Sequence, residues 1–391
     1  MTEVLRAGVW RQESPGSVSW ALVGRLPAWV SVEVEPRYNA PGTWTLTVPW
    51  DAQSQKVLAT DALTFDIPRG ESWHRLMTTA LVERYRPYAD ENGRMLLDLS
   101  GAGALDLLGD ATAWPIPTSG LSSQSTAYYV ASGPAETVLR NVAAANLLTR
   151  RGDPYVIPAS EGRGASVKLK ERFTNLLVLH QEKATAAGLG FRMGLVETTG
   201  PTRAEMRLEY YVPVDRSARV RLSHKVGNLR SWSQSTEAPK VTRPITGGGG
   251  KGANRIFRQK IDTAAEATYG RRREGFLDDR DTTDTAELDE RLDEELLNGA
   301  AASGFELDAV EAEGMRFATH FDLGDKVKVE LLTGLSSVET LNGIKFSASG
   351  AGPSIALLPG NPDAGNPMFT QAAITQAMRR RISNLERNEE S

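Results

Sequence analysis

The sequence predicts an α+β protein that is mainly β, with two β-barrel-like domains, an α+β insertion between them and a C-terminal helix. Strand-like alternation of apolar and polar residues dominates the first 115 positions and returns after residue 240, while helical periodicity lies between them. At 391 residues the chain exceeds one ordinary hydrophobic core. The predicted division is 1–115 for the first barrel-like domain, 116–239 for the α+β domain, 240–349 for the second barrel-like domain with a helical insertion, and 350–391 for a linker and an amphipathic helix.

The first domain is predicted to consist of short strands. Two alternating runs, Val30–Val34 and Trp44–Val48, flank the turn PRYNAPG and predict a β-hairpin. The segment LTFDIP predicts another strand, and LMTTALVERYRPY with GRMLLDLSG predicts a further pair. The segment ALDLLGDATAWPIP then predicts a short helical turn that its prolines stop. Several short strands with turns between them are typical of a barrel or sandwich.

The second domain combines helices and strands. Residues 133–148 predict a helix with Pro134 in its first turn, and 172–190 predict a second helix that ends at Gly188 or Gly190. The segments GFRMGLVE and AEMRLEYYVPV predict paired strands. ARVRLS predicts one more strand, before the turn KVGN.

The third domain returns to strands around one helix. KVTRPITG and ANRIFRQKI predict strands on either side of a glycine run, and residues 284–304 predict a helix. Asp284 suits the N-cap position, Glu287 completes a capping box, and Leu288 begins a leucine stripe. The segment GMRFATHFDLGDKVKVELL predicts two strands around the turn DLGD.

The last 40 residues change in composition. GAGPSIALLPGNPDAGNPMF is rich in Gly, Pro and Asn and predicts a linker. Residues 370–388 predict an amphipathic helix that is too short and too charged to be stable alone, so we expect it to dock on another surface. Its apolar side is formed by Ile374, Met378, Ile382 and Leu385.

Composition excludes several classes of function. The net charge of −4 gives no general attraction to nucleic acid or anionic membrane, and the absence of cysteine excludes disulfides and thiolate chemistry. We expect no signal peptide, because the segment MTEVLRAGVWRQESPG lacks an apolar core, and no membrane-spanning segment. The four histidines are far apart in sequence and form no metal-binding motif, so we expect no metal or cofactor.

The run TGGGGKGANR (246–255) poses the main chemical question, because glycine-rich loops can bind phosphate. A P-loop places Ser or Thr after its lysine, whereas this chain has Gly252 after Lys251. The following segment predicts a strand, so no helix N-terminus is available for a phosphate. The sequence therefore predicts a structural loop between two strands. No GxSxG motif indicates a serine hydrolase either.

An acidic run extends from Glu274 to Glu295 and holds eleven carboxylates against two arginines. It lacks the spacing of a calcium-binding loop, and we interpret it as the solvated face of a helix and its preceding loop. An acidic surface along a channel, where like charge keeps DNA from adhering, is the alternative. For the arginines at 271–273 we favour pairing with this acidic run over binding of a phosphate.

Six segments in order along the chain resemble the hub, or minor tail, proteins of long-tailed phages, particularly phages of actinobacteria. The resemblance covers roughly residues 1–345, and the order of the segments is its specific part. The segments are DLSGAGALDLLGDATAWPIP, GPAETVLRNVAAANL, LSHKVGNLRSWSQS, TGGGGKGANRIF, ATYGRRREGFLDDRDTTDTAELDERLDEELL and FDLGDKVKVEL.

The resemblance implies a structural, non-enzymatic virion protein with two barrel-like hub domains. It further implies a homotrimer at the distal end of the tail, in contact with the distal tail protein, the end of the tape-measure protein, and a tip spike or receptor-binding proteins, with DNA passing through unbound. Residues expected to set turns and packing are Gly227, Asn228, Leu229, Gly247, Gly248, Gly249, Gly250, Tyr269, Gly270, Glu274, Gly324 and Asp325. No catalytic, cofactor or metal residue is expected.

Two other functions stay open at this stage. One is a cell-wall hydrolase that acts at the tail tip. The other is a carbohydrate-binding tail module that uses Trp44, Trp50 and Trp73. Because these tryptophans lie in strand-like patterns, core packing is the favoured interpretation of their role.

Overall fold

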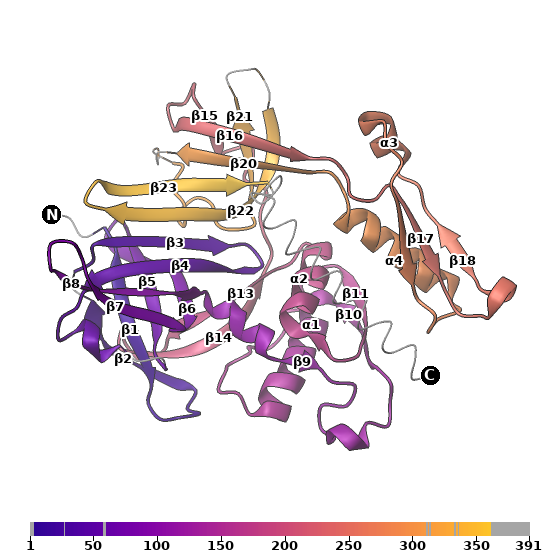
Figure 1. The fold of residues 1–391 in the computed structure, drawn as a ribbon, viewed down its shortest axis with the longest axis horizontal. Helices are drawn as coiled ribbons and strands as arrows, with labels where there is room; N and C mark the ends of the chain where they lie inside the picture. Colours follow the sequence, from indigo (N-terminus) through magenta and orange to yellow (C-terminus); the bar gives the residue numbers. More distant parts are fainter. Residues whose placement is uncertain are drawn as a thin grey trace. The chain divides into compact units, whose positions relative to one another are not determined.

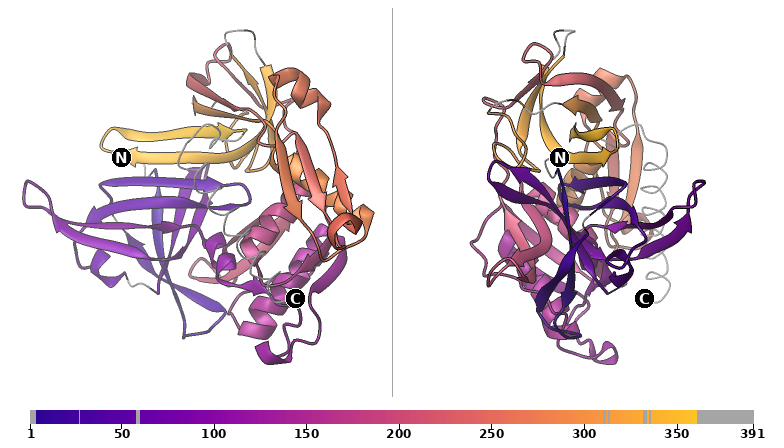
Figure 2. Two further views of the ribbon diagram at one scale, coloured as in Figure 1. Left: turned by 45° about the vertical axis from the view of Figure 1, so that its right-hand side comes forward. Right: turned by 90° about the vertical axis from the view of Figure 1, so that its left-hand side faces the viewer.

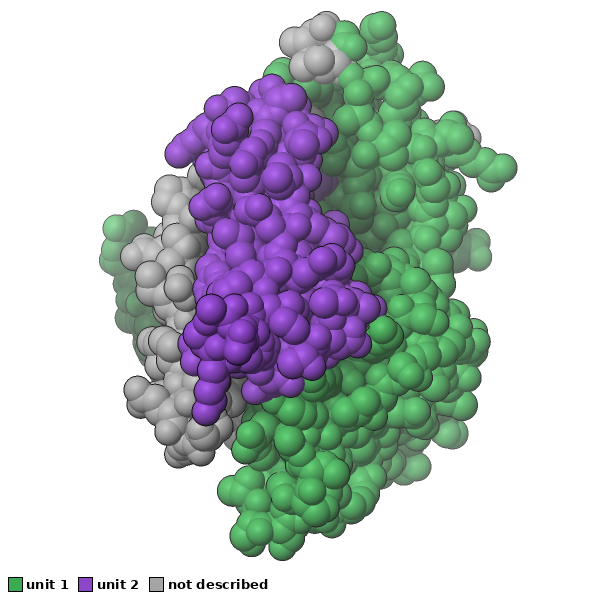
Figure 3. Space-filling view, turned by 90° about the vertical axis from the view of Figure 1, so that its right-hand side faces the viewer, with its two compact units in different colours: residues 1–232, 307–359 green, residues 233–306, 360–391 purple. Residues whose placement is uncertain are grey.

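Two large sheets organise the chain in the computed structural model, which describes residues 4–360 except 27, 58–59, 310–311, 313, 332–333 and 335. The described chain falls into two compact units. Unit 1 contains residues 1–232 and 307–359, and unit 2 contains residues 233–306 (Figure 3). The protein is therefore mainly β with several sheets, as the sequence predicted, whereas the four-part division stays a prediction.

The first sheet has six strands and mixes distant parts of unit 1. Strand β2, near the N-terminus, pairs with strand β14 of a hairpin that follows the helical region. In this pair Ala21 lies opposite Arg203. The β13–β14 hairpin confirms the predicted pair. In spatial order the strands are β13 (Gly190–Glu197), β14 (Arg203–Tyr211), β2 (Ser19–Leu26), β1 (Arg6–Gln12), β5 (Ala62–Arg69) and β6 (Ser72–Leu81).

The second sheet has ten strands and joins the two ends of the described chain (Figures 1 and 2). The predicted hairpin is confirmed, with Val34 opposite Trp44. The predicted strand LMTTALVERYRPY is divided between β6 of the first sheet and β7, and only β7 pairs with β8. In spatial order the strands are β16 (Leu229–Glu237), β20 (Ala302–Ala309), β23 (Gly352–Pro359), β22 (Ser336–Ser349), β3 (Ser31–Arg37), β4 (Ala40–Pro49), β8 (Met95–Ala102) and β7 (Arg84–Ala89), with β15 (Arg221–Ser223) and β21 (Lys326–Glu330) attached beside β22.

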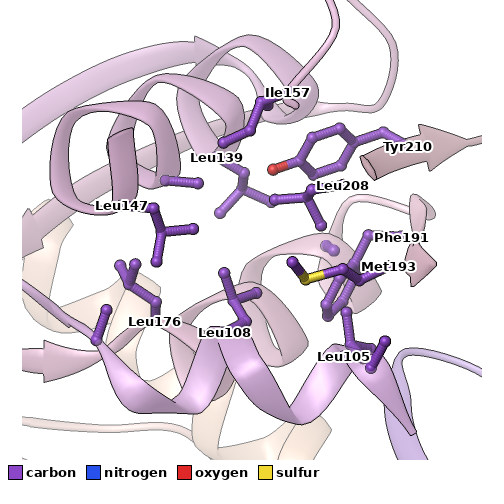
Figure 4. Packing of buried hydrophobic residues seen from close by; sticks show 14 of the residues in the cluster. Leu105, Leu108, Leu139, Leu147, Ile157, Leu176, Phe191, Met193, Leu208 and Tyr210 are labelled. Atoms are coloured by element: carbon purple, nitrogen blue, oxygen red, sulfur yellow. The ribbon is translucent and has the colours of Figure 1, made fainter. Parts of the chain in front are cut away.

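A helical layer covers one part of the six-stranded sheet and forms a shared hydrophobic core with it (Figure 4). Leu139, Leu176 and Leu208 are fully buried there, and burial of one such side chain contributes about 1.5–3 kcal/mol. The helices are η2 (Ala104–Asp110), α1 (Ala135–Ala143), the π-helix η4 (Ala144–Arg151) and α2 (Leu176–Ala186), accompanied by the short strands β9 (Thr112–Ala113), β10 (Tyr129–Pro134), β11 (Ser166–Glu171) and β12 (Thr174–Asn175).

Unit 2 is a three-stranded sheet with α4 packed on one face. The predicted capping of α4 is confirmed in part, because the Asp284 carboxylate accepts a hydrogen bond from the Ala286 amide at 2.8 Å. Leu288 and Leu292 are fully buried beneath the helix. The elements are β17 (Arg243–Gly247), β18 (Phe257–Gln259), α3 (Thr263–Tyr269), β19 (Glu274–Asp278) and α4 (Thr285–Asn298). The remaining short helices of the chain are η1 (Ser54–Lys56), η3 (Leu121–Ser123) and η5 (Gly252–Asn254).

Four sequence interpretations need correction. The helix predicted over 284–304 ends at Asn298, where Gly299 follows, and β20 begins at Ala302. Residues 314–320 form turns and isolated bridges rather than a strand, with Ala318 at φ +64°. The predicted linker after residue 350 contains β23, because its apolar run pairs with β22. Strand β15 is shorter than predicted.

The predicted helix at 370–388 lies outside the described residues, so it stays a prediction. Within the described part of the chain, every helix is too short or too polar to cross a membrane.

A buried polar pair fixes α2 against β14. His180 Nδ1 lies 2.7 Å from the Leu176 carbonyl oxygen, and its Nε2 lies 3.1 Å from the Tyr210 hydroxyl. Both contacts are satisfied by a neutral imidazole that donates from Nδ1 and accepts at Nε2. Burial lowers the pKa of His180 from 6.5 to about 4.

We therefore expect stability to fall as the pH drops from about 6.5 towards 4, because the unfolded imidazole takes up a proton that the folded one excludes. The free energy of unfolding should decrease by up to about 1.4 kcal/mol per pH unit in this window from this one group. The measurement is urea unfolding of the wild type and of His180→Phe between pH 7 and 4.5.

In His180→Phe we expect a lower stability but a smaller slope against pH. A hydrogen bond from Arg163 lowers the pKa of the Glu136 carboxylate to about 2. The contribution of Glu136 to stability is therefore lost only below about pH 4.5, outside the pH range of this measurement. Equal slopes in the two proteins would show that His180 is not held neutral.

Candidate interaction surfaces

An open cavity of about 760 Å³ lies in unit 1 between β6 and β13. Arg75 of β6 lines this cavity, forms an ion pair with Asp66 and donates a hydrogen bond to the Leu195 carbonyl at 2.8 Å. A longer contact of 3.5 Å joins Arg75 to Glu197. Arg75 thus links the two strands, and the nearby Leu195 amide donates to the Thr78 hydroxyl at 3.1 Å.

Cationic and aromatic side chains lie together in this cavity. The Arg6 guanidinium stacks 3.7 Å from the centroid of Trp73, an arrangement that cation–π attraction stabilises. His74 is the one histidine among the described lining residues, and neither serine nor cysteine is among them. Burial lowers the pKa of His74, and its ring lies edge-on to Phe317. A serine or cysteine nucleophile paired with a histidine base is therefore not assembled from the described residues of this cavity.

The glycine run lies between β17 and β18, and its backbone groups are used within unit 2. The Gly248 amide donates to the Ile256 carbonyl at 2.8 Å, and the Gly249 amide donates to the Thr282 carbonyl at 2.7 Å. The Arg255 guanidinium donates to the carbonyls of Gly247 and Gly248. A phosphate loop presents its amides to the ligand, whereas two of these amides already have partners. The geometry is that of a structural loop.

Each glycine of the run is closely surrounded. A Cβ atom on Gly247 would lie 2.6 Å from Arg255 Nη2, and one on Gly248 would lie 2.8 Å from Leu288 Cδ1. On Gly250, where φ is +116°, it would lie 2.5 Å from the Asn254 carbonyl oxygen. Glycine is therefore required here by packing and, at Gly250, by backbone conformation.

The two predicted turns of unit 1 flank neighbouring strands. Asn228 accepts a hydrogen bond from the Ser223 amide and donates to the Arg221 carbonyl, both at 2.9 Å, and Gly227 precedes it at φ +80°. This closes the turn between β15 and β16, after which Leu229 is buried.

Asp325 closes the turn that precedes β21 through hydrogen bonds of its side chain. Its carboxylate accepts hydrogen bonds from the amides of Val214 at 2.7 Å and Asp322 at 3.1 Å. Gly324, at φ +87°, lies so close to Tyr38 that a Cβ would meet Tyr38 Cε2 at 2.5 Å. Their predicted role in setting barrel shape stays a prediction, but both residues tie separate segments of unit 1 together.

The remaining predicted residues lie in unit 2. Tyr269 is the last residue of α3, and Gly270 ends that helix in a left-handed conformation at φ +65°. Glu274 begins β19 opposite Arg243 of β17. The predicted residues therefore lie at several turns and do not converge on one pocket.

The arginines at 271–273 do not pair with the acidic run in the way we expected. Arg272 forms an ion pair with Glu266 of α3, at 3.9 Å, and Arg273 donates to the Pro239 carbonyl. The carboxylates of α4 instead contact β18 and its extension, through Arg258 with Asp289 at 2.7 Å and Lys260 with Asp293 at 2.6 Å. The acidic helix is thus neutralised in part by the strand on which it lies.

The tryptophans differ from one another in burial. Trp44 is 1% exposed and packs 5.6 Å from the ring of Phe65, so it is a core residue and not a sugar platform. Trp50 and Trp73 are half-buried, and Trp73 lies beneath Arg6 in the cavity.

Sequence analysis missed an apolar surface on unit 2. Ile245, Phe257, Ile261 and Phe276 lie on the strand face opposite α4, and Phe257 and Phe276 are 56% and 48% exposed. We call these four residues the aromatic face. The alternation in β18 and β19 was visible in the sequence, but the parallel pairing of β17 with β19 that brings the residues together was not.

Among the described residues, no cluster of three or more His, Asp or Glu side chains could hold a metal ion.

Comparison with solved structures shows the fold of phage tail proteins. A 43 kDa tail protein of prophage MuSo2 from Shewanella oneidensis superposes with a TM-score of 0.57 at 14% identity, covering 92% of this chain and 99% of that one. A tail protein from Neisseria meningitidis MC58 gives 0.57 at 14% identity, with coverage of 93% and 99%. Prophage tail protein gp18 from Listeria monocytogenes EGD-e gives 0.51 at 11% identity, with coverage of 96% and 100%.

The chain belongs to the siphovirus ReqiPepy6 Gp37-like protein family, whose model matches residues 9–361. A comparison with curated protein sequences finds no match. The predicted resemblance to tail proteins of long-tailed phages is confirmed.

We expect Gly250→Ala to lower the free energy of unfolding by about 1–3 kcal/mol, because the new methyl group is strained by the backbone and by the Asn254 carbonyl. Lys251→Ala is the matched control in the same loop and should leave stability within about 0.5 kcal/mol of the wild type. Chemical denaturation measures both variants.

Calorimetric titration with MgATP completes this test. A structural loop predicts no binding to the wild type and no effect of Lys251→Ala. Binding that Lys251→Ala weakens would contradict the structural interpretation and restore the phosphate-binding one.

Proposed function

We propose that this protein is a structural, non-enzymatic virion component that forms the homotrimeric hub at the distal end of the phage tail. It would join the tail tube to the tail tip and surround the channel through which DNA leaves. The observation that supports this proposal is the structural similarity to phage tail proteins, which covers 92–96% of this chain and 99–100% of theirs. The family match to residues 9–361 supports it as well.

The described surfaces support an assembly role. The residues singled out from the sequence tie strands and turns together within each unit, as Asp325 does between β21 and the segment before β15. The main cavity combines ion-paired arginines with apolar side chains, a mixture typical of protein–protein interfaces.

The proposed partners follow from the position at the tail end. They are a second and third copy of this chain, the distal tail protein, the end of the tape-measure protein, and a tip spike or receptor-binding proteins. DNA would pass without specific binding. The carboxylates of α4 beyond those that contact β18 would suit a surface that repels a phosphate backbone.

The direct solution test is the mass of the purified chain by light scattering. We expect three times the monomer mass of 42.5 kDa, both for the full chain and for a chain that ends at residue 360. A trimer only in the full chain would assign trimerisation to residues 361–391. A monomer in both at micromolar concentration would contradict a hub that trimerises by itself.

The two alternatives have separate tests. Zymography on host peptidoglycan should give no cleared band, and a cleared band would establish the hydrolase. Host glycan binding that Trp50→Ala or Trp73→Ala abolishes, with folding intact, would establish the carbohydrate-binding module.

A further inference from the structure

The aromatic face of unit 2 is formed by register rather than by sequence proximity. Ile245 lies opposite Phe276 in the parallel β17–β19 pair and opposite Gln259 in the antiparallel β17–β18 pair. Directly opposed residues project from the same side of a sheet. Phe257 lies beside Gly247 on the same side, so the face crosses all three strands.

The opposite side of this sheet is already covered. Arg258 and Lys260 point to α4, where they contact Asp289 and Asp293. A Cβ on Gly275 would lie 4.0 Å from Glu295 of the same helix. Strand alternation therefore directs Phe257, Ile261 and Phe276 away from α4.

Arg255 gives the aromatic face a defined shape. Its guanidinium lies 5.4 Å from the ring centroid of Phe257 and 5.6 Å from that of Phe276, and it forms an ion pair with Asp278. Gly247 leaves the room for this arrangement, since a Cβ there would meet both Arg255 and Phe276 within 3 Å. The rings of Phe257 and Phe276 thus lie on either side of the Arg255 guanidinium, whose charge Asp278 neutralises.

We propose that the aromatic face binds the C-terminal segment 370–388 of the same chain. That segment lies outside the described residues, and its sequence places Ile374, Met378 and Ile382 at intervals of four. On a helix these three residues span about 12 Å along one side. Three strands span about 10 Å, so the stripe matches the width of the face.

The path of the chain favours this occupant. β23 runs antiparallel to β20, with Leu357 opposite Leu307 and Ala356 opposite Asp308. The chain after Pro359 is therefore directed towards the start of β20, which follows the end of α4 by only three residues. The ten residues 360–369 can then extend up to about 33 Å before the helix begins.

Charge favours the same occupant. Residues 370–388 contain four arginines and one glutamate, so the segment is cationic. Glu274 lies at one end of the aromatic face and is exposed. An arginine of the docked helix is thus attracted to this carboxylate at moderate ionic strength.

Disulfide trapping tests the proposal cleanly because the natural chain contains no cysteine. The test pair is Phe276→Cys with Met378→Cys in the full chain. The matched control is Phe276→Cys with Arg380→Cys, which places the thiol on the opposite side of the helix at the same distance along the chain. Phe276 is 48% exposed, so its replacement leaves the core of unit 2 unchanged. Circular dichroism checks that both proteins fold.

Under mild oxidation at low protein concentration, we expect the test pair to form an intrachain disulfide on the order of tenfold faster than the control pair, because docking raises the local concentration of the two thiols. Equal rates, or no intrachain bond in either protein, would overturn the proposal. A bond that forms only between chains would overturn it as well and assign the segment to a neighbouring copy. Intrachain disulfide formation does not require a trimer. A negative result would therefore overturn the proposed docking of residues 370–388 without bearing on the proposed hub function.

Discussion

The pairing of β3 with β22 is the constraint on which the rest of the structure depends. Val34 lies opposite Phe346 and Val32 lies opposite Ala348, although more than 300 residues separate these partners in sequence. Lys345 adds an ion pair with Glu33 at 3.1 Å across the same junction. Since β3 continues into β4, β8 and β7 and β22 continues into β23 and β20, this one junction makes a single sheet from both ends of the described chain. The segment of the chain between β3 and β22 is consequently held at both of its ends by this strand pair.

Polar ties then connect the large sheets of unit 1. Asn39, at φ +52° in the β3–β4 turn, accepts a hydrogen bond from the Phe191 amide and donates to the Leu189 carbonyl. Arg75 and Thr78 join β6 to β13 in the same way. Such contacts between non-consecutive segments suit a component whose function is to keep its shape while other proteins assemble on it.

Local features of the fold were predictable because neighbouring residues determine them. The β3–β4 and β13–β14 hairpins follow from alternation around a turn, and Asp284 marks the start of α4. The glycine run lies in the connection between β17 and β18, as predicted, although the short helix η5 directly follows Lys251 and β18 begins only at Phe257.

Features that depend on distant partners were not predictable. The apolar run of β23 lies between glycines and prolines and is recognisable as a strand only beside β22. Arg272 contacts Glu266 because α3 intervenes, a helix that the sequence analysis did not identify. The aromatic face required the parallel register of β17 with β19, which is invisible in any single segment.

An electron cryo-microscopy map of the tail of virions that contain this protein tests the central claim most directly. The account predicts three copies of this fold in a closed ring at the distal end of the tail tube, with an open channel along the axis. A map that places the fold elsewhere in the virion, or in a number of copies other than three, would contradict it.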